Sequence, residues 1–217
     1  KDPYGRIVGK IVGVYSDVDG KVESVEIRVN EFEFHTVPAE RIVLDSGGLI
    51  IYPAWKSEAN KAIKQIERAK RRLKALEDLY SKGEIPRHAY MEFKNKVESQ
   101  VKKLSEVSKA VREMINRRIY ELEDQVTKIE RALTAVKMSY IAGEIGERAY
   151  KASADMRRLA RDKNLEEKKD AKRTLEKLQK VLEEPVGVEP KKETVSEEEH
   201  AEEKAPASQQ GETPIFV

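Results

Sequence analysis

The chain contains no cysteine among its 217 residues, and aromatic residues make up only 6% of it. The absence of cysteine excludes a disulfide framework and thiolate chemistry. So few aromatic residues, together with a mean hydropathy of -0.69, are typical of elongated helices rather than of a compact domain with a large core. No apolar run approaches the roughly 20 residues that span a bilayer. We therefore expect a soluble protein in a reducing, cytoplasmic compartment.

Residues that carry catalysis are also scarce. The three histidines, His35, His88 and His200, lie far apart in the sequence, and no pair has the spacing of metal ligands. No glycine-rich loop stands ahead of a helix to hold a phosphate, and no nucleophile lies beside a base. We therefore predict that the chain is not an enzyme and uses no metal or cofactor.

Charge, by contrast, is abundant, since 38% of the residues are charged. The net charge is −3 over residues 1–55, +10 over residues 56–184 and −5 over residues 185–217. A basic middle between acidic ends indicates an anionic partner, either nucleic acid or a membrane surface. The alternative is that long solvated helices simply carry charge on their flanks.

Residues 1–54 are expected to form strands, because they combine β-branched residues with alternation of apolar and polar positions. The expected strands lie at Arg6–Tyr15, Lys21–Val29, Glu31–Val37, Arg41–Leu44 and Leu49–Tyr52. So many short strands in so short a segment favour a small closed β-barrel, because closure removes exposed strand edges.

Residues 55–184 are expected to be helical almost throughout. From Ala62 to Tyr80 the apolar residues follow one another at alternating steps of four and three, which is the heptad seam of a coiled coil. A second series runs from Tyr90 to Tyr140, with an average step close to the 3.5 residues of a left-handed supercoil. We therefore predict a rod that self-associates into a homo-oligomer or filament through this seam. The seam residues proposed for self-association are Leu104, Val111, Leu122, Val126, Ile129 and Leu133.

A short repeat interrupts the helical pattern. Tyr80–Tyr90 and Tyr140–Tyr150 share a Tyr, a Gly-Glu-Ile triplet, an Ala and a second Tyr, at an offset of 60 residues. Glycine suits the left-handed position just after a helix, and Pro86 suits the first turn of the next one. The pattern predicts turns near 83–85 and 143–145, between helices at about 56–82, 86–141 and 146–183. If both turns reverse the chain, the first helix covers the first half of the second, and the third covers the other half. Hinges or binding loops at these sites are the alternative.

Cationic residues gather in the first expected helix. Such clusters bind phosphates through release of counterions, without reading base sequence. A membrane surface would use the same charges, and the flanks of a coiled coil are the plainest alternative. The cluster comprises Lys61, Lys64, Arg68, Lys70, Arg71, Arg72 and Lys74.

The C-terminal residues have a different composition. Residues 185–210 are acidic and polar and are expected to form a disordered linker. Residues 211–217 end in the apolar triplet Ile215, Phe216 and Val217, which is typical of a tethered docking peptide. The alternative is an ordinary chain end.

The N-terminal segment resembles a PRC-barrel domain, a small β-barrel that serves as an adaptor module. The resemblance is carried by the glycines and β-branched residues of Gly5–Gly13, by the Asp-Gly turn before Lys21 and Val22, and by Pro38–Ile42. The order of parts is a PRC-type β-barrel, a long α-helical coiled coil and a tail with an apolar end. That order resembles the CdvA family of archaeal cell-division proteins over essentially the whole chain. The expected fold is therefore mixed but segregated, with β structure first and α structure after it.

The resemblance implies a filament-forming cell-division scaffold that associates with DNA or membrane, at mid-cell and at the inner membrane surface. It also implies recruitment of the ESCRT-III protein CdvB, whose winged-helix domain would accept a C-terminal peptide as an added strand. The matching residues are Thr213, Pro214, Ile215, Phe216 and Val217. The alternative is a nucleic-acid-binding structural or ribosome-associated protein that uses the basic coil, because PRC-like barrels also occur in ribosome-maturation factors.

Overall fold

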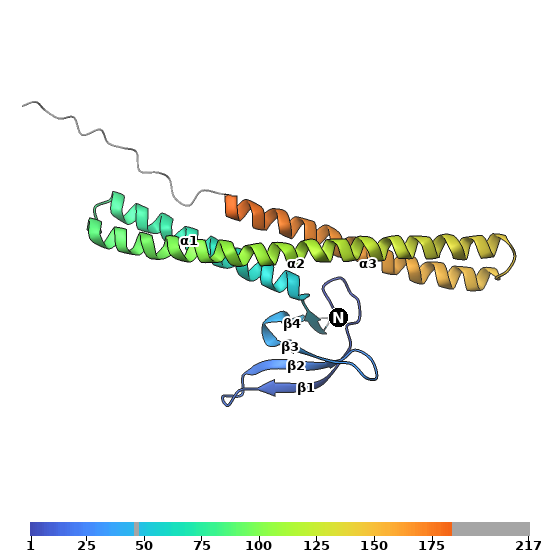
Figure 1. The fold of residues 1–217 in the computed structure, drawn as a ribbon. Coiled ribbons are helices and arrows are strands. Elements are labelled where there is room, and N and C mark those ends of the chain that lie inside the picture. The colour runs from blue at the N-terminus through green and yellow to red at the C-terminus, as the bar shows by residue number, and fades with distance from the viewer. Residues whose placement is uncertain (46–47, 184–217) are drawn as a thin grey trace, which may run out of the picture. The chain divides into compact units, whose positions relative to one another are not determined.

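The computed structural model describes residues 1–45 and 48–183, and within them five short strands precede three long helices (Figure 1). The strands are β1 (Lys10–Ser16), β2 (Val22–Arg28), β3 (Phe34–Pro38), β4 (Ile42–Asp45) and β5 (Gly48–Ile51), with one 3-10 turn, η1 (Ala39–Arg41), before β4. The helices are α1 (Ala54–Ser81), α2 (Arg87–Ile141) and α3 (Glu147–Glu183). The expected linker 185–210 and peptide 211–217 lie outside the described residues.

The strands form two antiparallel sheets that share one small core. One sheet has the order β1-β2-β3, and the other pairs β4 with β5. Val25 and Ile27 of β2, Val37 of β3 and Ile51 of β5 are buried together, and Ile42 of β4 packs against them. The β structure expected for residues 1–54 is therefore confirmed, whereas closure of the two sheets into one barrel stays a prediction.

The segment that precedes β1 connects the two sheets. The N–H of Ile51 donates to the carbonyl oxygen of Lys1 at 2.8 Å, and the backbone nitrogen of Lys1 donates to the carbonyl oxygen of Leu49 at 3.0 Å. Further along, Gly9 lies so close to β2 that a Cβ there would stand 2.4 Å from the carbonyl oxygen of Arg28. Only glycine permits this approach of two backbones.

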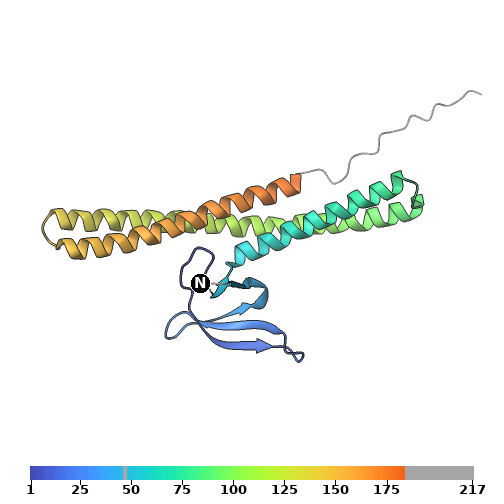
Figure 2. The ribbon, with the colours of Figure 1, turned by 180° about the vertical axis from the view of Figure 1, so that it is seen from behind.

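The two Gly-Glu-Ile sites are turns that reverse the chain (Figures 1 and 2). Gly83 has φ of 73°, in the left-handed region that glycine adopts at little cost. The N–H of Gly83 donates to the carbonyl of Tyr80, and the N–H of Glu84 donates to that of Leu79, which together form a Schellman motif. Gly143, with φ of 75°, closes the second turn with the equivalent pair of hydrogen bonds.

The repeated tyrosines stack across each turn. The rings of Tyr80 and Tyr90 have centroids 4.4 Å apart, and those of Tyr140 and Tyr150 are 4.7 Å apart. Stacked rings at these distances stabilise the contact beyond the area that they bury. The two copies of the repeat therefore form the same kind of helix–helix turn.

The three helices form two antiparallel hairpins that share α2. This helix has 55 residues, which at about 1.5 Å per residue makes it roughly 80 Å long. Helix α1 packs along its first half and α3 along its second half (Figure 1). In the middle all three helices meet, and Ile66, Ile115 and Leu178 are buried in one cluster. No helix of the described ranges 1–45 and 48–183 has the length and apolar character needed to cross a membrane.

The heptad seam of α2 is used inside the chain. The side chain of Leu122 is 0% exposed, and Val111 belongs to the central three-helix cluster. The other proposed seam residues, Leu104, Val126, Ile129 and Leu133, are half-buried in the single chain. Packing against α1 and α3 therefore accounts for the seam. The seam residues could pack fully against a second chain only if the helices of one chain separated first. Their role in self-association stays a prediction.

Candidate functional site

A buried polar cluster, which we call the junction, lies where the segment before β1 meets all three helices. Its centre is Glu167 of α3, whose side chain is 0% exposed. Arg118 of α2 donates to both carboxylate oxygens of Glu167, through Nε at 2.8 Å and Nη2 at 2.9 Å. The indole Nε1 of Trp55, at the start of α1, donates at 3.1 Å, and the guanidinium of Arg6 forms a further ion pair. One carboxylate thus receives hydrogen bonds from three separate segments.

A second carboxylate extends the junction. Asp170, one turn after Glu167 on α3, accepts hydrogen bonds from the hydroxyl of Tyr4 at 2.6 Å and from Nζ of Lys56. Asp2 holds the N-terminal segment in place, because its side chain accepts the backbone N–H groups of Tyr4 and Arg6 at 3.0 and 2.8 Å. The carboxylates of Asp2, Glu167 and Asp170 therefore pair with three cations, so the charges of this set balance. The cations are Arg6, Arg118 and Lys56.

The pKa values of the junction follow from this pairing. Burial by itself raises the pKa of Glu167, but the hydrogen bonds and charges of Arg118 and Arg6 outweigh burial and hold that pKa below its ordinary value of 4.5. The hydrogen bond from Arg118 to Glu167 likewise raises the pKa of the Arg118 guanidinium. Burial, helped by the hydrogen bond to Asp170, raises the pKa of the Tyr4 hydroxyl. All these groups keep the charge states in which they pair.

Sequence reasoning missed the junction entirely. One signal was present: Asn164, Ala171 and Leu178 follow one another at steps of seven, and all three are buried. This heptad series places Asn164 and Glu167 on the apolar seam of α3, where a polar residue requires a partner. The partners could not be found in the same way, because Arg6 is 161 residues from Glu167.

The cationic cluster of α1 does not form a single face. Lys61, Lys64, Arg68 and Arg71 follow one another at steps of three and four, and all are exposed. They lie opposite the buried seam of α1, because residues at this spacing share one side of a helix. We call these four residues the outer basic face; Lys61 also lies 3.6 Å from the carboxylate of Glu40. Of the other members of the predicted cluster, Lys70 is half-buried on the side of the seam, whereas Arg72 and Lys74 are exposed and flank the outer basic face.

The junction and the outer basic face offer hydrogen bonds and charges to other groups. Among residues 1–45 and 48–183, no group of three His, Asp or Glu side chains could hold a metal ion. The junction fixes segments relative to one another, and the outer basic face presents cations to solvent. The predicted partner-binding residues, Thr213 to Val217, lie outside the described residues.

Comparison with known proteins gives two matches. The family described as the CdvA-like coiled-coil domain matches residues 54–201, so the match begins at the first residue of α1 and includes all three helices. A protein of Sulfolobus acidocaldarius named Cell division protein A is 38% identical over 190 residues, which are 88% of this chain and 79% of that protein. No solved structure matches the chain.

Proposed function

The chain belongs to the family of proteins with a CdvA-like coiled-coil domain, and from this premise we propose that it is a structural scaffold of cell division. The observation that carries the proposal is the 38% identity to a protein named Cell division protein A, which extends over most of both chains. Neither the family description nor that name refers to a catalytic activity, so we propose a non-enzymatic role.

The scaffold role has a physical basis in the helices. Two hairpins that share α2 hold their ends roughly 80 Å apart at about 1.5 Å per residue. The junction ties the β sheets to the middle of α3 through Arg6 and Tyr4. Such an arrangement can present several binding surfaces at fixed distances. Assembly of many copies into a filament, at mid-cell and at the inner membrane surface, belongs to the same proposal.

The outer basic face is proposed to bind an anionic polymer or surface, either DNA or acidic lipid. Its four cations are exposed and lie on one side of α1. Neutralising phosphates with such cations releases counterions, so binding should weaken as salt rises. A nucleic-acid-binding structural or ribosome-associated role, the alternative function, would use the same face, because the helical region carries the chain's excess of positive charge.

We expect the triple substitution Lys64→Glu, Arg68→Glu and Arg71→Glu to weaken binding to duplex DNA and to vesicles that contain phosphatidylserine. The slope of log K against log salt should fall in magnitude by roughly 2–3, because each lost phosphate contact removes about 0.9. The matched control reverses the exposed residues Arg131, Lys137 and Arg148, which change the net charge equally but lie away from α1. Titration at several salt concentrations measures both. Equal slopes for the two variants would show that the residues of the outer basic face are solvated flanks of the coiled coil with no special part in binding.

The C-terminal peptide is proposed to recruit an ESCRT-III protein of the CdvB type. Ile215, Phe216 and Val217 are residues that favour strands, and Pro214 lacks an N–H, so it suits only the start or the unpaired side of a strand. Added as a strand to a winged-helix domain, this peptide would gain affinity from its backbone and specificity from alternate side chains. Each apolar side chain contributes about 1.5–3 kcal/mol when fully buried.

A peptide of residues 205–217 should bind a CdvB-like winged-helix domain with micromolar affinity, because ordering the peptide offsets part of the gain from burial. Isothermal calorimetry measures the affinity. The control peptide carries Ile215→Asp and Phe216→Asp and should not bind. If both peptides bound equally, or if neither bound, the peptide would have no part in recruitment and the scaffold proposal would stand without it.

A further inference from the structure

An open groove runs between α1 and α2 on the side of the central bundle that faces the Tyr80–Tyr90 turn. It consists of two adjoining cavities of about 290 and 350 Å³, which share Arg72 and Gln100 as lining residues. The apolar side chains that line it are Ala69, Leu76, Phe93, Val97 and Leu104. Phe93 is 51% exposed although it lies in the seam of α2.

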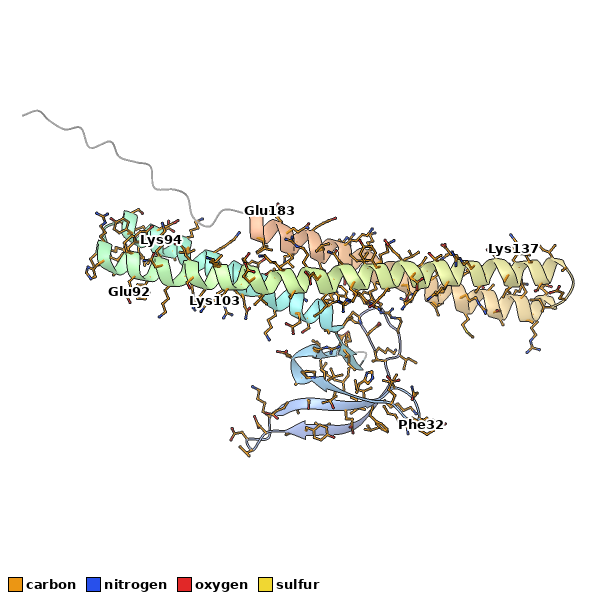
Figure 3. All side chains as sticks on the ribbon, in the orientation of Figure 1. Phe32, Glu92, Lys94, Lys103, Lys137 and Glu183 are labelled. Atoms are coloured by element: carbon orange, nitrogen blue, oxygen red, sulfur yellow. The ribbon has the colours of Figure 1, made fainter. Side chains whose placement is uncertain are left out.

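The groove adjoins the central three-helix cluster. Leu104 lines the first cavity and also packs against the central cluster, where Leu178 and Val181 of α3 are buried. Lys177 of α3 lies 3.7 Å from Glu67 of α1, which is the neighbour in sequence of Arg68 in the first cavity. In the view of Figure 3, Glu183, the last residue of α3, is labelled above α2, and Lys103, which lines the first cavity, is labelled below it. In the centre, α3 serves as a third helix against α1 and α2, and no residue of α3 lines either cavity.

The lining of the groove is cationic as well as apolar. Arg68, Arg72, Lys96 and Lys103 contribute to the two cavities, and no acidic side chain of the described residues lines them. From Gln65 to Leu76 the groove follows α1 for roughly 17 Å at about 1.5 Å per residue, which is about three turns of a helix. The walls of the groove are two helices, so a third helix would match its shape.

We propose that this groove binds an acidic amphipathic helix of a partner protein. An apolar stripe on that helix would cover Phe93, Val97 and Leu76, and its acidic flanks would pair with Arg72 and Lys103. Nucleic acid is the weaker match, because a phosphate backbone leaves the apolar floor uncovered. The proposal goes beyond the scaffold function and shares only Arg68 with the outer basic face.

The probe is a labelled peptide of about three heptads with Leu at positions a and d and Glu at positions e and g. Its acidic flanks repel one another, so it pairs poorly with itself. Fluorescence anisotropy with the full chain should give binding at least about tenfold tighter than that of a peptide with Lys at e and g. The variant Phe93→Ser should weaken binding of the acidic peptide about tenfold, and Arg72→Glu with Lys103→Glu should reverse the preference between the two peptides.

Three controls accompany these measurements. Phe93 is half exposed, so circular dichroism should show that Phe93→Ser keeps its helices, and DNA binding through the outer basic face should not change. Reversal of Arg131 and Lys137 should leave peptide binding as it is. The proposal would be overturned if the two peptides bound equally well. It would also be overturned if Phe93→Ser left the affinity for the acidic peptide unchanged and duplex DNA displaced that peptide. Self-association of the chain that is lost in Phe93→Ser would instead assign the groove to a second copy.

Discussion

Substitution of Glu167 by alanine is expected to lower the free energy of unfolding by about 3–5 kcal/mol, the cost of removing one partner from a buried ion pair. The variant leaves the guanidiniums of Arg118 and Arg6 and the indole N–H of Trp55 without their shared acceptor. Urea denaturation followed by far-ultraviolet circular dichroism measures the change. The matched control is Glu166→Ala, because Glu166 is exposed and pairs along α3 with Lys163; it should change stability by no more than about 0.5 kcal/mol. Equal stability of the two variants would show that the junction adds little.

The same carboxylate gives the protein a dependence on acid. The pKa of Glu167 is lower in the folded chain than its ordinary value of 4.5. A group with a depressed pKa contributes stability above its unfolded pKa, and that contribution is lost as the pH falls through the folded pKa. Stability of the wild type should therefore decline below about pH 4.5, and the decline should be shallower in Glu167→Gln, which has no proton to gain. Parallel declines in the two proteins would assign the acid sensitivity to other carboxylates.

Substitution of Leu122 by alanine is expected to cost about 2–5 kcal/mol of unfolding free energy, through lost burial and the cavity that remains. The side chain of Leu122 is fully buried within one chain. The control is Tyr120→Ala, two residues away, because Tyr120 is 70% exposed and its loss should cost little.

The Leu122 variant also decides between two uses of the seam. If the seam packs inside one chain, the loss of stability is the same at every protein concentration, since unfolding then involves no change in the number of particles. If the seam joins two chains, the apparent stability rises with concentration. Denaturation over a wide range of concentrations, with sedimentation velocity of both variants, measures the difference. If the loss of stability depended on protein concentration, the seam would take part in self-association.

The sequence was sufficient to predict the helices and their turns, because both depend on local signals. Heptad steps mark α1 and α2, and Gly83 and Gly143 mark the ends of α1 and α2. The strands were equally clear from alternation, but the number of sheets was not. Pairing of strands depends on contacts such as that between Lys1 and Ile51, which no periodicity reveals.

The candidate sites were harder to predict because they are assembled from distant residues. A count of cations located the cluster on α1, yet only the helix geometry separates the outer basic face from Arg72, which lines the groove with residues of α2. The seam of α2 predicted a coiled coil correctly. Whether its partner helices belong to the same chain depends on how the two turns fold, and heptads alone carry no information on that.

The long separation between the partners in the junction has a consequence for synthesis of the protein. Arg6 is translated 161 residues before Glu167, which at about 5–20 residues per second is a delay of roughly 8–30 s. Throughout that time the strands emerge and can pair, and the first hairpin can form from neighbouring residues, while the guanidinium of Arg6 remains hydrated. The N-terminal segment therefore completes its contacts only after the ribosome has made most of α3. In a nascent chain that ends before Glu167, the β region lacks the ion pair between Arg6 and Glu167 that joins it to α3.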